Sequence, residues 1–560
     1  MELRRGVKMG LALIALIPIL VVGILMIRYN WPSTKAMPVG FFTSLILAAI
    51  FWKMPLKWIG AATITGAINT IDILLIVYGA LLILQIMRKS GGVEGIAQSM
   101  AAVSTDRRVQ VIVIGFLMEA FFEGAAGFGT PAAVAAPLLV GLGFPPLVAA
   151  MVALIGNSAP VTYGAVGTPI IGGFASLKSM VEAGGFQGDF GTFLINTGGF
   201  AGILHLLVGS FIPLAMVCTM TLIVDKSIKK GLEVWPLALF GGLVFTIPEV
   251  LISNFVGPEI PSLLGALIGI PIFVIAIRKG VFIPKTKWDF KPHNEWEDDW
   301  EGEVAASVAN VENKNVMSAG KAWAPYVLIG ILLLLGRLKW IGLTPILKQW
   351  NITWHNILGT SLSRGITPLY NPGVIPFMLV ALIIPFMHGL DKKEAAKAWK
   401  DTLKQIKPAS IALFFALGMT YIMMNSGAAA NSDSMLIVMA KTAANLAGRG
   451  WYIVAPIVGI LGAFISGSAT VSDIMFGALQ FSAANQVGIP VTPILALQSV
   501  GAAAGNMICV HNVVAVLTTV GLVGKEGKII KNNIKISLGY GILAGIFALI
   551  IVSVFMKNIF

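Results

Sequence analysis

Long uncharged stretches alternate with short polar loops along almost the whole chain. Runs of the length that a helix needs to cross a hydrocarbon core of roughly 30 Å lie at 9–27, 37–52, 62–87, 146–173, 192–224, 234–253, 260–277, 322–338, 370–387, 408–426, 491–522 and 536–556. This pattern predicts an all-α polytopic membrane protein with about twelve transmembrane helices.

Two further apolar segments, 108–143 and 451–488, are interrupted in the middle by small and polar residues. The first interruption reads Glu123-Gly-Ala-Ala-Gly-Phe-Gly-Thr-Pro131, and the second reads Ser466-Gly-Ser-Ala-Thr-Val-Ser-Asp473. Each segment forms either two short spans or one re-entrant helical hairpin, and hydropathy does not distinguish the two. In both cases the chain returns to the side from which it came.

The two halves of the chain follow one plan. Phe121-Phe-Glu-Gly124 and Gly156-Asn157 in the first half correspond, in order, to Phe464-Ile-Ser-Gly467 and Gly505-Asn506 in the second. An odd number of spans separates corresponding helices, so the halves are expected to be inverted repeats, an arrangement typical of secondary transporters. We expect a first repeat at 1–224 (hairpin 108–143, broken helix 146–173), two connecting helices and a polar cytoplasmic loop at 225–321, and a second repeat at 322–560 (hairpin 451–488, broken helix 491–522).

Composition supports a membrane location. Of 560 residues, 57% are hydrophobic and 12% are charged, whereas soluble domains have about 25% charged residues. The net charge of +13 resides in short loops, which indicates orientation in a membrane rather than nucleic-acid binding. The loop charges place both termini outside, the 282–321 loop inside as a solvated connector, and 391–407 on the inner surface as an amphipathic helix.

The broken segments are candidates for an anion site. Helix ends inside a membrane are tolerated where protein or a water-filled cavity satisfies the freed backbone groups, and helix N-termini attract anions. Glycines allow close approach to the backbone, and Asn, Ser and Thr side chains add donors. The candidate substrate-binding residues are Gly124, Gly127, Gly129, Thr130, Asn157, Ser158, Ser468, Thr470 and Asn506. The alternative is that these small residues only pack helices together.

Ionisable side chains inside apolar segments are few, and such residues are usually functional. They are Asp72, Glu119, Glu123, His205, Glu249, Asp473 and His511. Desolvation and neighbouring charge favour the neutral form of a carboxyl group, so Glu119, Glu123, Asp473 and His511 are candidates for proton coupling. His205 is expected to be a hydrogen-bonded packing residue, and bracing of the hairpin is the alternative role for Glu123.

The motifs at the breaks resemble the L-lactate permease family. The resemblance rests on Glu123 to Pro131, Asn157-Ser-Ala-Pro-Val161 and Gly164-Ala-Val-Gly-Thr-Pro169, with further matches at 253–259, 476–480 and 520–526. It implies an elevator-type carboxylate transporter with two opposed hairpins. It also implies uptake of L-lactate, and of related 2-hydroxy monocarboxylates such as D-lactate and glycolate, with protons across the plasma membrane.

Other functions remain as alternatives. A sodium-coupled di- or monocarboxylate carrier is the nearest, although no Arg or Lys within an apolar segment offers a second anion subsite. A membrane-embedded enzyme is disfavoured because the chain has no catalytic motif, and a channel is disfavoured because inverted, interrupted hairpins are typical of transporters. The chain also has no P-loop, so ATP does not drive transport from within it. We therefore expect no catalytic residues, cofactor or metal, and the expected partners are a small carboxylate, a proton and the lipid bilayer, with a homodimer as a further option.

Overall fold

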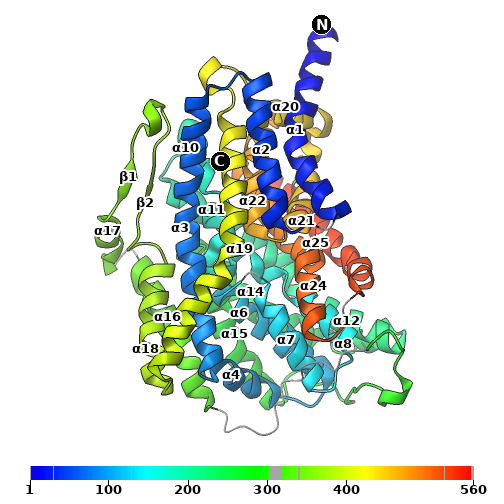
Figure 1. Ribbon diagram of the computed structural model, residues 1–560. Helices are drawn as coiled ribbons and strands as arrows, with labels where there is room; N and C mark the ends of the chain where they lie inside the picture. Colours follow the sequence, from blue (N-terminus) through cyan, green and yellow to red (C-terminus); the bar gives the residue numbers. More distant parts are fainter. Residues whose placement is uncertain are drawn as a thin grey trace.

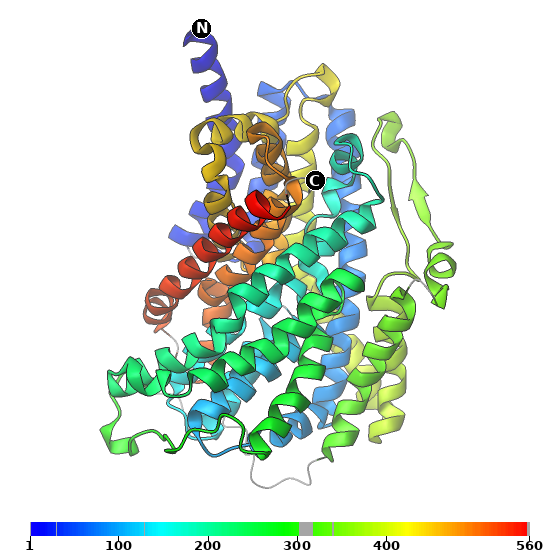
Figure 2. The ribbon, with the colours of Figure 1, turned by 180° about the vertical axis from the view of Figure 1, so that it is seen from behind.

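The computed structural model describes residues 2–29, 31–127, 129–301, 317–338, 341–522, 524–556 and 560, with side chains described from residue 9 onward. The described chain is almost entirely helical, and the helices form one tall bundle (Figure 1). A single two-stranded hairpin, β1 (Ile352–Trp354) with β2 (Arg364–Ile366), stands at the edge of the bundle in the described part of the chain (Figure 2). The helical fold class predicted from hydropathy is confirmed, and this hairpin is an addition to it.

Eleven helical stretches among the described residues are long and apolar enough to cross a membrane. They are α1 (Glu2–Tyr29, apolar from Met9), α2 (Ser33–Phe51), α3 (Leu56–Lys89), α11–α12 (Phe190–Asp225), α14 (Trp235–Phe255), α15 (Pro261–Arg278), α16 (Ala319–Arg337), α19 with the turn after it (Lys392–Ala430), α20–α21 (Met435–Ser466), α23–α24 (Val491–Thr519) and α25 (Glu526–Val554). A twelfth span is obtained if the bent segment Pro146–Gly156 plus Ala159–Ala183 crosses as one unit.

The spans differ from the prediction at two places. The predicted span 370–387 is a shorter apolar helix, composed of the π-helical η8 (Gly373–Met378) and α18 (Leu379–His388). Conversely, α20 (Met435–Ala447) runs through the short turn η10 (Gly448–Gly450) into α21 (Trp451–Ser466), which lengthens the first arm of the second hairpin into a candidate span. The total stays near twelve because these two differences offset each other.

Both interrupted segments fold as helical hairpins. The first consists of α5 (Arg107–Ile112), η1 (Val113–Met118) and α6 (Glu119–Ala125), which pack against the returning α7 (Thr130–Gly141). The second consists of α21 and the returning α22 (Ala469–Val487). In Figure 1 the first hairpin lies in the lower half of the molecule and the second in the upper half.

Each hairpin is followed by a helix that breaks directly after Gly-Asn. In the first half, α8 (Pro146–Gly156) ends at Asn157, and η2 (Ala159–Tyr163) and α9 (Gly164–Ile171) follow. In the second half, α23 (Val491–Gly505) ends at Asn506, and η11 (Asn506–Ile508) and α24 (Val510–Thr519) follow. All residues of α8 and α23 are buried, so the broken helices form the centre of the bundle.

The remaining helical elements connect these units. They are α4 (Gly92–Ala101), η3 (Ala175–Leu177), α10 (Lys178–Ala183), α11 (Phe190–Leu207), η4 (Gly209–Phe211), α12 (Ile212–Asp225), α13 (Ile228–Leu232), η5 (His293–Glu295), α17 (Leu343–Lys348), η7 (Ile357–Gly359) and η9 (Ala428–Ala430).

Residues 391–407 do not form a separate surface helix, and this expectation is wrong. They are the first half of α19 (Lys392–Asn425), a continuous helix of 34 residues that packs along the equally long α3. Pro408 lies inside α19 without ending it. The amphipathic pattern arises because one face of this half, including Ala398 and Thr402, is buried while its lysines stay outside.

The two segments predicted to lie inside, 282–321 and 391–407, are joined by ion pairs to other loops at the same end of the molecule. Ion pairs join several of them: Lys89 with Glu394 and Asp401 at 3.3 Å each, Arg107 with Asp289 at 2.7 Å, Lys226 with Glu297 at 2.7 Å, and Lys528 with Asp299. The described part of the 282–321 loop, which is rich in acidic and aromatic residues and is called the acidic-aromatic loop below, is less solvated than expected. Trp288 and Trp300 are 8% and 2% exposed, because the loop packs over the ends of the helices: Trp288 Nε1 donates to Asp225 Oδ2 at 2.7 Å.

A reciprocal glycine contact holds α3 against the π-helical η8. A Cβ atom on Gly79 would lie 2.2 Å from the carbonyl oxygen of Gly373, and one on Gly373 would lie 2.1 Å from that of Leu75.

We predict that Gly79→Leu separates these helices and lowers the apparent melting temperature of the detergent-solubilised protein by several degrees, since overpacking costs typically 1–3 kcal/mol. Gly539→Leu in α25, where nothing lies within 4 Å, is the matched control and should melt like the parent; equal melting of both variants would contradict the prediction.

Candidate functional site

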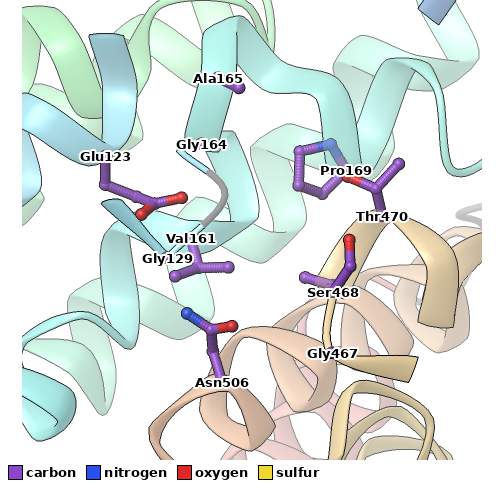
Figure 3. A pocket seen from close by; sticks show the side chains of 11 residues that line it. Glu123, Gly129, Val161, Gly164, Ala165, Pro169, Gly467, Ser468, Thr470 and Asn506 are labelled. Atoms are coloured by element: carbon purple, nitrogen blue, oxygen red, sulfur yellow. The ribbon is translucent and has the colours of Figure 1, made fainter. Parts of the chain in front are cut away.

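Both hairpin tips and both broken helices meet at one small polar cavity inside the bundle (Figure 3). Its volume of about 30 Å³ leaves room for only a few water-sized groups. The lining residues are Glu123, Gly129, Val161, Gly164, Ala165, Pro169, Gly467, Ser468, Ala469, Thr470 and Asn506. The structure therefore brings together segments more than three hundred residues apart, as the correspondence between the halves predicts.

A chain of side-chain hydrogen bonds runs along the cavity and joins the two halves. Asn512 Nδ2 donates to Asn506 Oδ1 at 2.6 Å, and Asn506 Nδ2 donates to Asn157 Oδ1 at 2.7 Å. Asn157 Nδ2 in turn donates to Glu123 Oε2 at 2.8 Å. All three amides point their N–H groups toward Glu123, and successive hydrogen bonds of one direction strengthen each other in a low dielectric. The carboxyl group of Glu123 is thus the acceptor end of a four-residue relay.

Glycines bring the backbone of the first tip close to this relay. Gly127 and Gly129 have φ angles of +60° and +72°, a backbone conformation that residues other than glycine rarely adopt. A Cβ atom on Gly129 would lie 2.4 Å from Asn512 Oδ1, and one on Gly164 would lie 2.1 Å from Glu123 Oε1. The space beside the relay exists only because these positions have no side chain.

The start of α9 carries backbone strain that sequence reasoning missed. Ala165, Val166 and Gly167 have φ angles of +41°, +58° and +73° in succession. Left-handed conformations cost non-glycine residues of order 1–2 kcal/mol each, and such strain tends to accumulate at functional sites. Ala165 lines the cavity. No sequence signal distinguishes Ala165 and Val166 from ordinary helical residues, because both types favour right-handed backbone.

The second tip presents a helix N-terminus to the cavity. Ser468 is the N-cap of α22, and its hydroxyl accepts a hydrogen bond from the Val471 amide at 3.4 Å. Thr470 lies in the first turn and lines the cavity. The first N–H groups of a helix lack intrahelical acceptors and carry a partial positive charge, so this end of the cavity favours an anion.

Asp473 lies one turn deeper in α22 than the tip and does not line the cavity. Gln498 Nε2 donates to its Oδ1 atom at 3.3 Å, while Oδ2 has no hydrogen-bond partner among the described residues. Gln480 extends this contact by donating to Gln498 Oε1 at 2.8 Å. The two glutamines were absent from the candidates, because they lie inside α22 and α23 and not at the Gly-Asn breaks that drew attention to Asn157 and Asn506.

Three of the predicted binding residues are engaged elsewhere. Gly124 faces α15, where a Cβ atom would lie 2.3 Å from the Leu263 nitrogen. The hydroxyl groups of Thr130 and Ser158 each donate to a nearby backbone carbonyl, of Gly127 and Ile155, at 2.7 Å. These contacts fit the alternative that small residues pack and cap helices.

Two of the proposed coupling residues lie behind the cavity. Glu119, one turn before Glu123, is fully buried, and neither of its carboxyl oxygens has a hydrogen-bond partner in the described part of the chain. His511 lies behind the second tip, where its Nδ1 atom would be 2.8 Å from a Cβ atom on Gly467. It lines a separate hollow together with Glu526.

A second polar cluster braces the break in the first half. His205 bonds to the Tyr540 hydroxyl at 2.6 Å through Nδ1 and to the Thr162 hydroxyl at 2.8 Å through Nε2. Ser262 Oγ donates to the carbonyl of Pro160 at 2.8 Å and lies 3.4 Å from Glu249 Oε1. Both contacts hold η2, so His205 has the hydrogen-bonded packing role expected of it.

A polytopic helical protein whose two hairpins end at a shared polar cavity belongs to the class of multi-pass membrane permeases. The family is equally plain from the sequence: residues 11–555 match the L-lactate permease family, and the chain belongs to it. The resemblance at the hairpin motifs is thereby confirmed.

Individual relatives match over nearly their whole lengths. A relative from Haemophilus influenzae is 32% identical over 97% of this chain and 99% of its own. The L-lactate permease of Bacillus subtilis is 29% identical (88% and 87%), and the glycolate permease GlcA of Escherichia coli is 28% identical (97% and 96%). Among solved structures, the YdaH transporter of Alcanivorax borkumensis aligns over 88% of this chain and 87% of its own with 12% identity and a TM-score of 0.42, a distant likeness on which no functional statement rests. These bacterial relatives place the protein in a bacterial plasma membrane.

We predict that Gly129→Val abolishes transport of lactate in proteoliposomes while the protein still folds, because the added side chain would displace Asn512 from the relay. Gly91→Val is the matched control. Gly91 has a similar φ of +76°, but nothing lies within 4 Å of its Cβ position, so this variant carries the same backbone strain without the clash and should retain transport. Parental transport by Gly129→Val would show that this glycine serves only the turn.

Proposed function

We propose that this protein takes up L-lactate and related 2-hydroxy monocarboxylates, including D-lactate and glycolate, together with protons. The names of its relatives support the substrate class. The observation that carries the proposal is the position of Glu123: a carboxyl group ends a one-directional amide relay and faces the same cavity as the N-terminus of α22.

The substrate carboxylate binds at the second tip in this proposal. The N–H groups at the start of α22, with Ser468 and Thr470 beside them, provide donors and positive potential without a fixed cationic side chain. Asn506 also lines the cavity and is placed to contact the 2-hydroxyl group. Because the cavity is small, the two tips must separate slightly to admit a molecule of six non-hydrogen atoms.

Glu123 carries the proton. An ionised Glu123 and a bound carboxylate would repel each other by several kcal/mol in a low dielectric. The substrate carboxylate therefore binds well only when a proton lies between it and Glu123, and its binding in turn favours uptake of that proton. Asn157 donates to Glu123 Oε2, which leaves Oε1 to hold the proton and donate it toward the substrate. Mutual stabilisation of proton and substrate binding is the thermodynamic requirement of symport.

Transport proceeds by movement of the cavity as part of a rigid body, with the repeats 1–224 and 322–560 inverted and both hairpins re-entrant. Each hairpin packs so closely on its own broken helix that no side chain fits between the two backbones. A Cβ atom on Gly156 would clash with the carbonyl of Gly115, and one on Gly501 would lie 2.1 Å from the carbonyl of Pro456. These contacts make each hairpin and its helix one unit. The long helices α3 and α19 then form the wall along which the units move.

The first test uses the unmodified protein in proteoliposomes. We expect labelled L-lactate to accumulate when a proton gradient is imposed, with loss of accumulation after addition of a protonophore. A sodium gradient at equal pH should produce no accumulation. Accumulation driven by sodium alone would replace the proton in this proposal by sodium and would remove Glu123 from the coupling role.

The second test replaces Glu123 by Gln, which resembles the protonated acid and can still accept the hydrogen bond from Asn157. This variant should exchange lactate across the membrane in counterflow at close to the parental rate, while accumulation driven by a pH gradient is lost. Glu94→Gln, a change of an exposed carboxylate in α4, is the control and should accumulate lactate normally. If Glu123→Gln accumulates lactate on a proton gradient as the parent does, Glu123 is not the coupling residue.

A further inference from the structure

A second and larger cavity lies at the end of the molecule opposite the ion-paired loops. Its volume is about 570 Å³, and it is enclosed by α3, by the segment from η3 to α10, by the β1–β2 hairpin and by Tyr421 of α19. In Figures 1 and 2 the hairpin flanks α3 at this end of the bundle. The loop charges predict that this end faces the outside.

Arg364 of β2 lines this cavity and has no ion-pair partner among the described residues. Its Nη1 atom donates to the carbonyl of Ala175 at 3.2 Å, whereas Nε is buried and has no hydrogen-bond partner. No carboxylate of the described residues lies within ion-pair distance of Arg364. A buried donor without an acceptor costs stability unless something fills the gap, and a guanidinium presents its donors in the fork that suits a carboxylate.

The other charged groups on the cavity wall already have partners. Lys178 and Glu182 lie 3.9 Å apart, and Asp72 accepts a hydrogen bond from Asn371 Nδ2 at 3.0 Å. Asp72 and Tyr421 line the same cavity as Arg364. An anion entering this space therefore meets two cations among the described lining residues: the exposed Lys178, which lies 3.9 Å from Glu182, and Arg364, whose Nε is buried without an acceptor.

Hydroxyl groups surround Arg364 and suit a hydroxylated ligand. Tyr421 OH accepts a hydrogen bond from Asn69 Nδ2 at 3.0 Å, which leaves its own proton available for donation. Ser176, Ser363 and Thr367 also line the cavity. A guanidinium flanked by hydroxyl groups complements a molecule that carries a carboxylate and a neighbouring hydroxyl.

One short segment connects this outer cavity with the central one. Gly164, Ala165 and Pro169 of α9 line the central cavity, while Ala175 and Ser176 of η3, which follows α9 after three intervening residues, line the outer one. Arg364 holds that segment through the carbonyl of Ala175. A ligand released from Arg364 is therefore already beside the element that forms the wall of the transport cavity.

We propose that the outer cavity is a vestibule in which Arg364 binds the 2-hydroxy monocarboxylate before it reaches the central cavity. This inference rests on the proposed function and adds an extracellular recognition site to it. The sequence alone directed attention away from such a site, because Arg364 belongs to a polar loop and not to an apolar segment.

The test compares Arg364→Gln with the parent in proteoliposomes of defined protein orientation. Glutamine can still donate to the Ala175 carbonyl but lacks the charge and the fork. We expect the KM for L-lactate offered from the outer face to rise roughly tenfold, the effect of losing a charge-assisted hydrogen bond, with kcat for uptake largely retained. The KM for lactate offered from the inner face should stay at the parental value, which a merely structural role of Arg364 would not produce.

Two further variants make the result specific. Arg364→Lys keeps the charge without the fork and should raise the outer KM by a smaller factor, which also tests the site if the glutamine variant does not fold. Arg449→Gln removes a charge from η10, away from the cavity lining, and should leave both KM values unchanged.

The outcomes separate this inference from the function on which it rests. No lactate uptake by the parent overturns both. Uptake by the parent with an unchanged outer KM in Arg364→Gln and Arg364→Lys overturns the vestibule alone. An equal rise of KM at both faces assigns Arg364 to the stability of the α9–η3 segment and likewise overturns the vestibule.

Discussion

The hydrogen bond from Asn506 to Asn157 is the contact on which the centre of the molecule depends. Each asparagine ends a buried helix, so each stands where backbone groups lose their helical partners inside the bundle. Such a break is tolerable at membrane depth only if other groups take over those hydrogen bonds. Here Asn506 of the second half donates to the side-chain oxygen of Asn157 at 2.7 Å and to its backbone carbonyl at 3.5 Å, so the break in the first half is completed from the second. The relay to Glu123 and the meeting of the two halves at the cavity depend on this contact.

Much of the fold is predictable because the relevant signals are long and strong. Apolar runs identify the spans, and the order of Gly-Asn breaks identifies which segments correspond. The prediction fails where tertiary contacts override local pattern. Residues 391–407 look like a surface helix in isolation, yet α3 provides a partner along their whole length. Similarly, Trp288 and Trp300 of the acidic-aromatic loop are buried where that loop packs over the helix ends.

The candidate site was predictable in its location but not in all its members. Asn157, Asn506, Glu123 and Gly129 could be singled out because polar or flexible residues are costly in apolar helices and therefore conspicuous. Gln480 and Gln498 lie inside helices away from the Gly-rich breaks, and Ala165 has an ordinary residue type for a helix, so only the geometry shows their importance. Gly124 shows the opposite error: its sequence context matches that of Gly127 and Gly129, but the side of the helix on which it falls assigns it to packing.

The pairing of Asn157 with Asn506 also bears on how the protein is made. The two residues are 349 positions apart, and a ribosome adding 5–20 residues per second needs roughly 20 to 70 s to synthesise that interval. During this time Asn157 and Glu123 can already be in the membrane without the group that completes their hydrogen bonds. The nascent first half must therefore be shielded by water, by the insertion machinery or by a chaperone until the second half arrives. Biogenesis of this protein thus has a vulnerable interval whose length is set by the distance between two asparagines in the sequence.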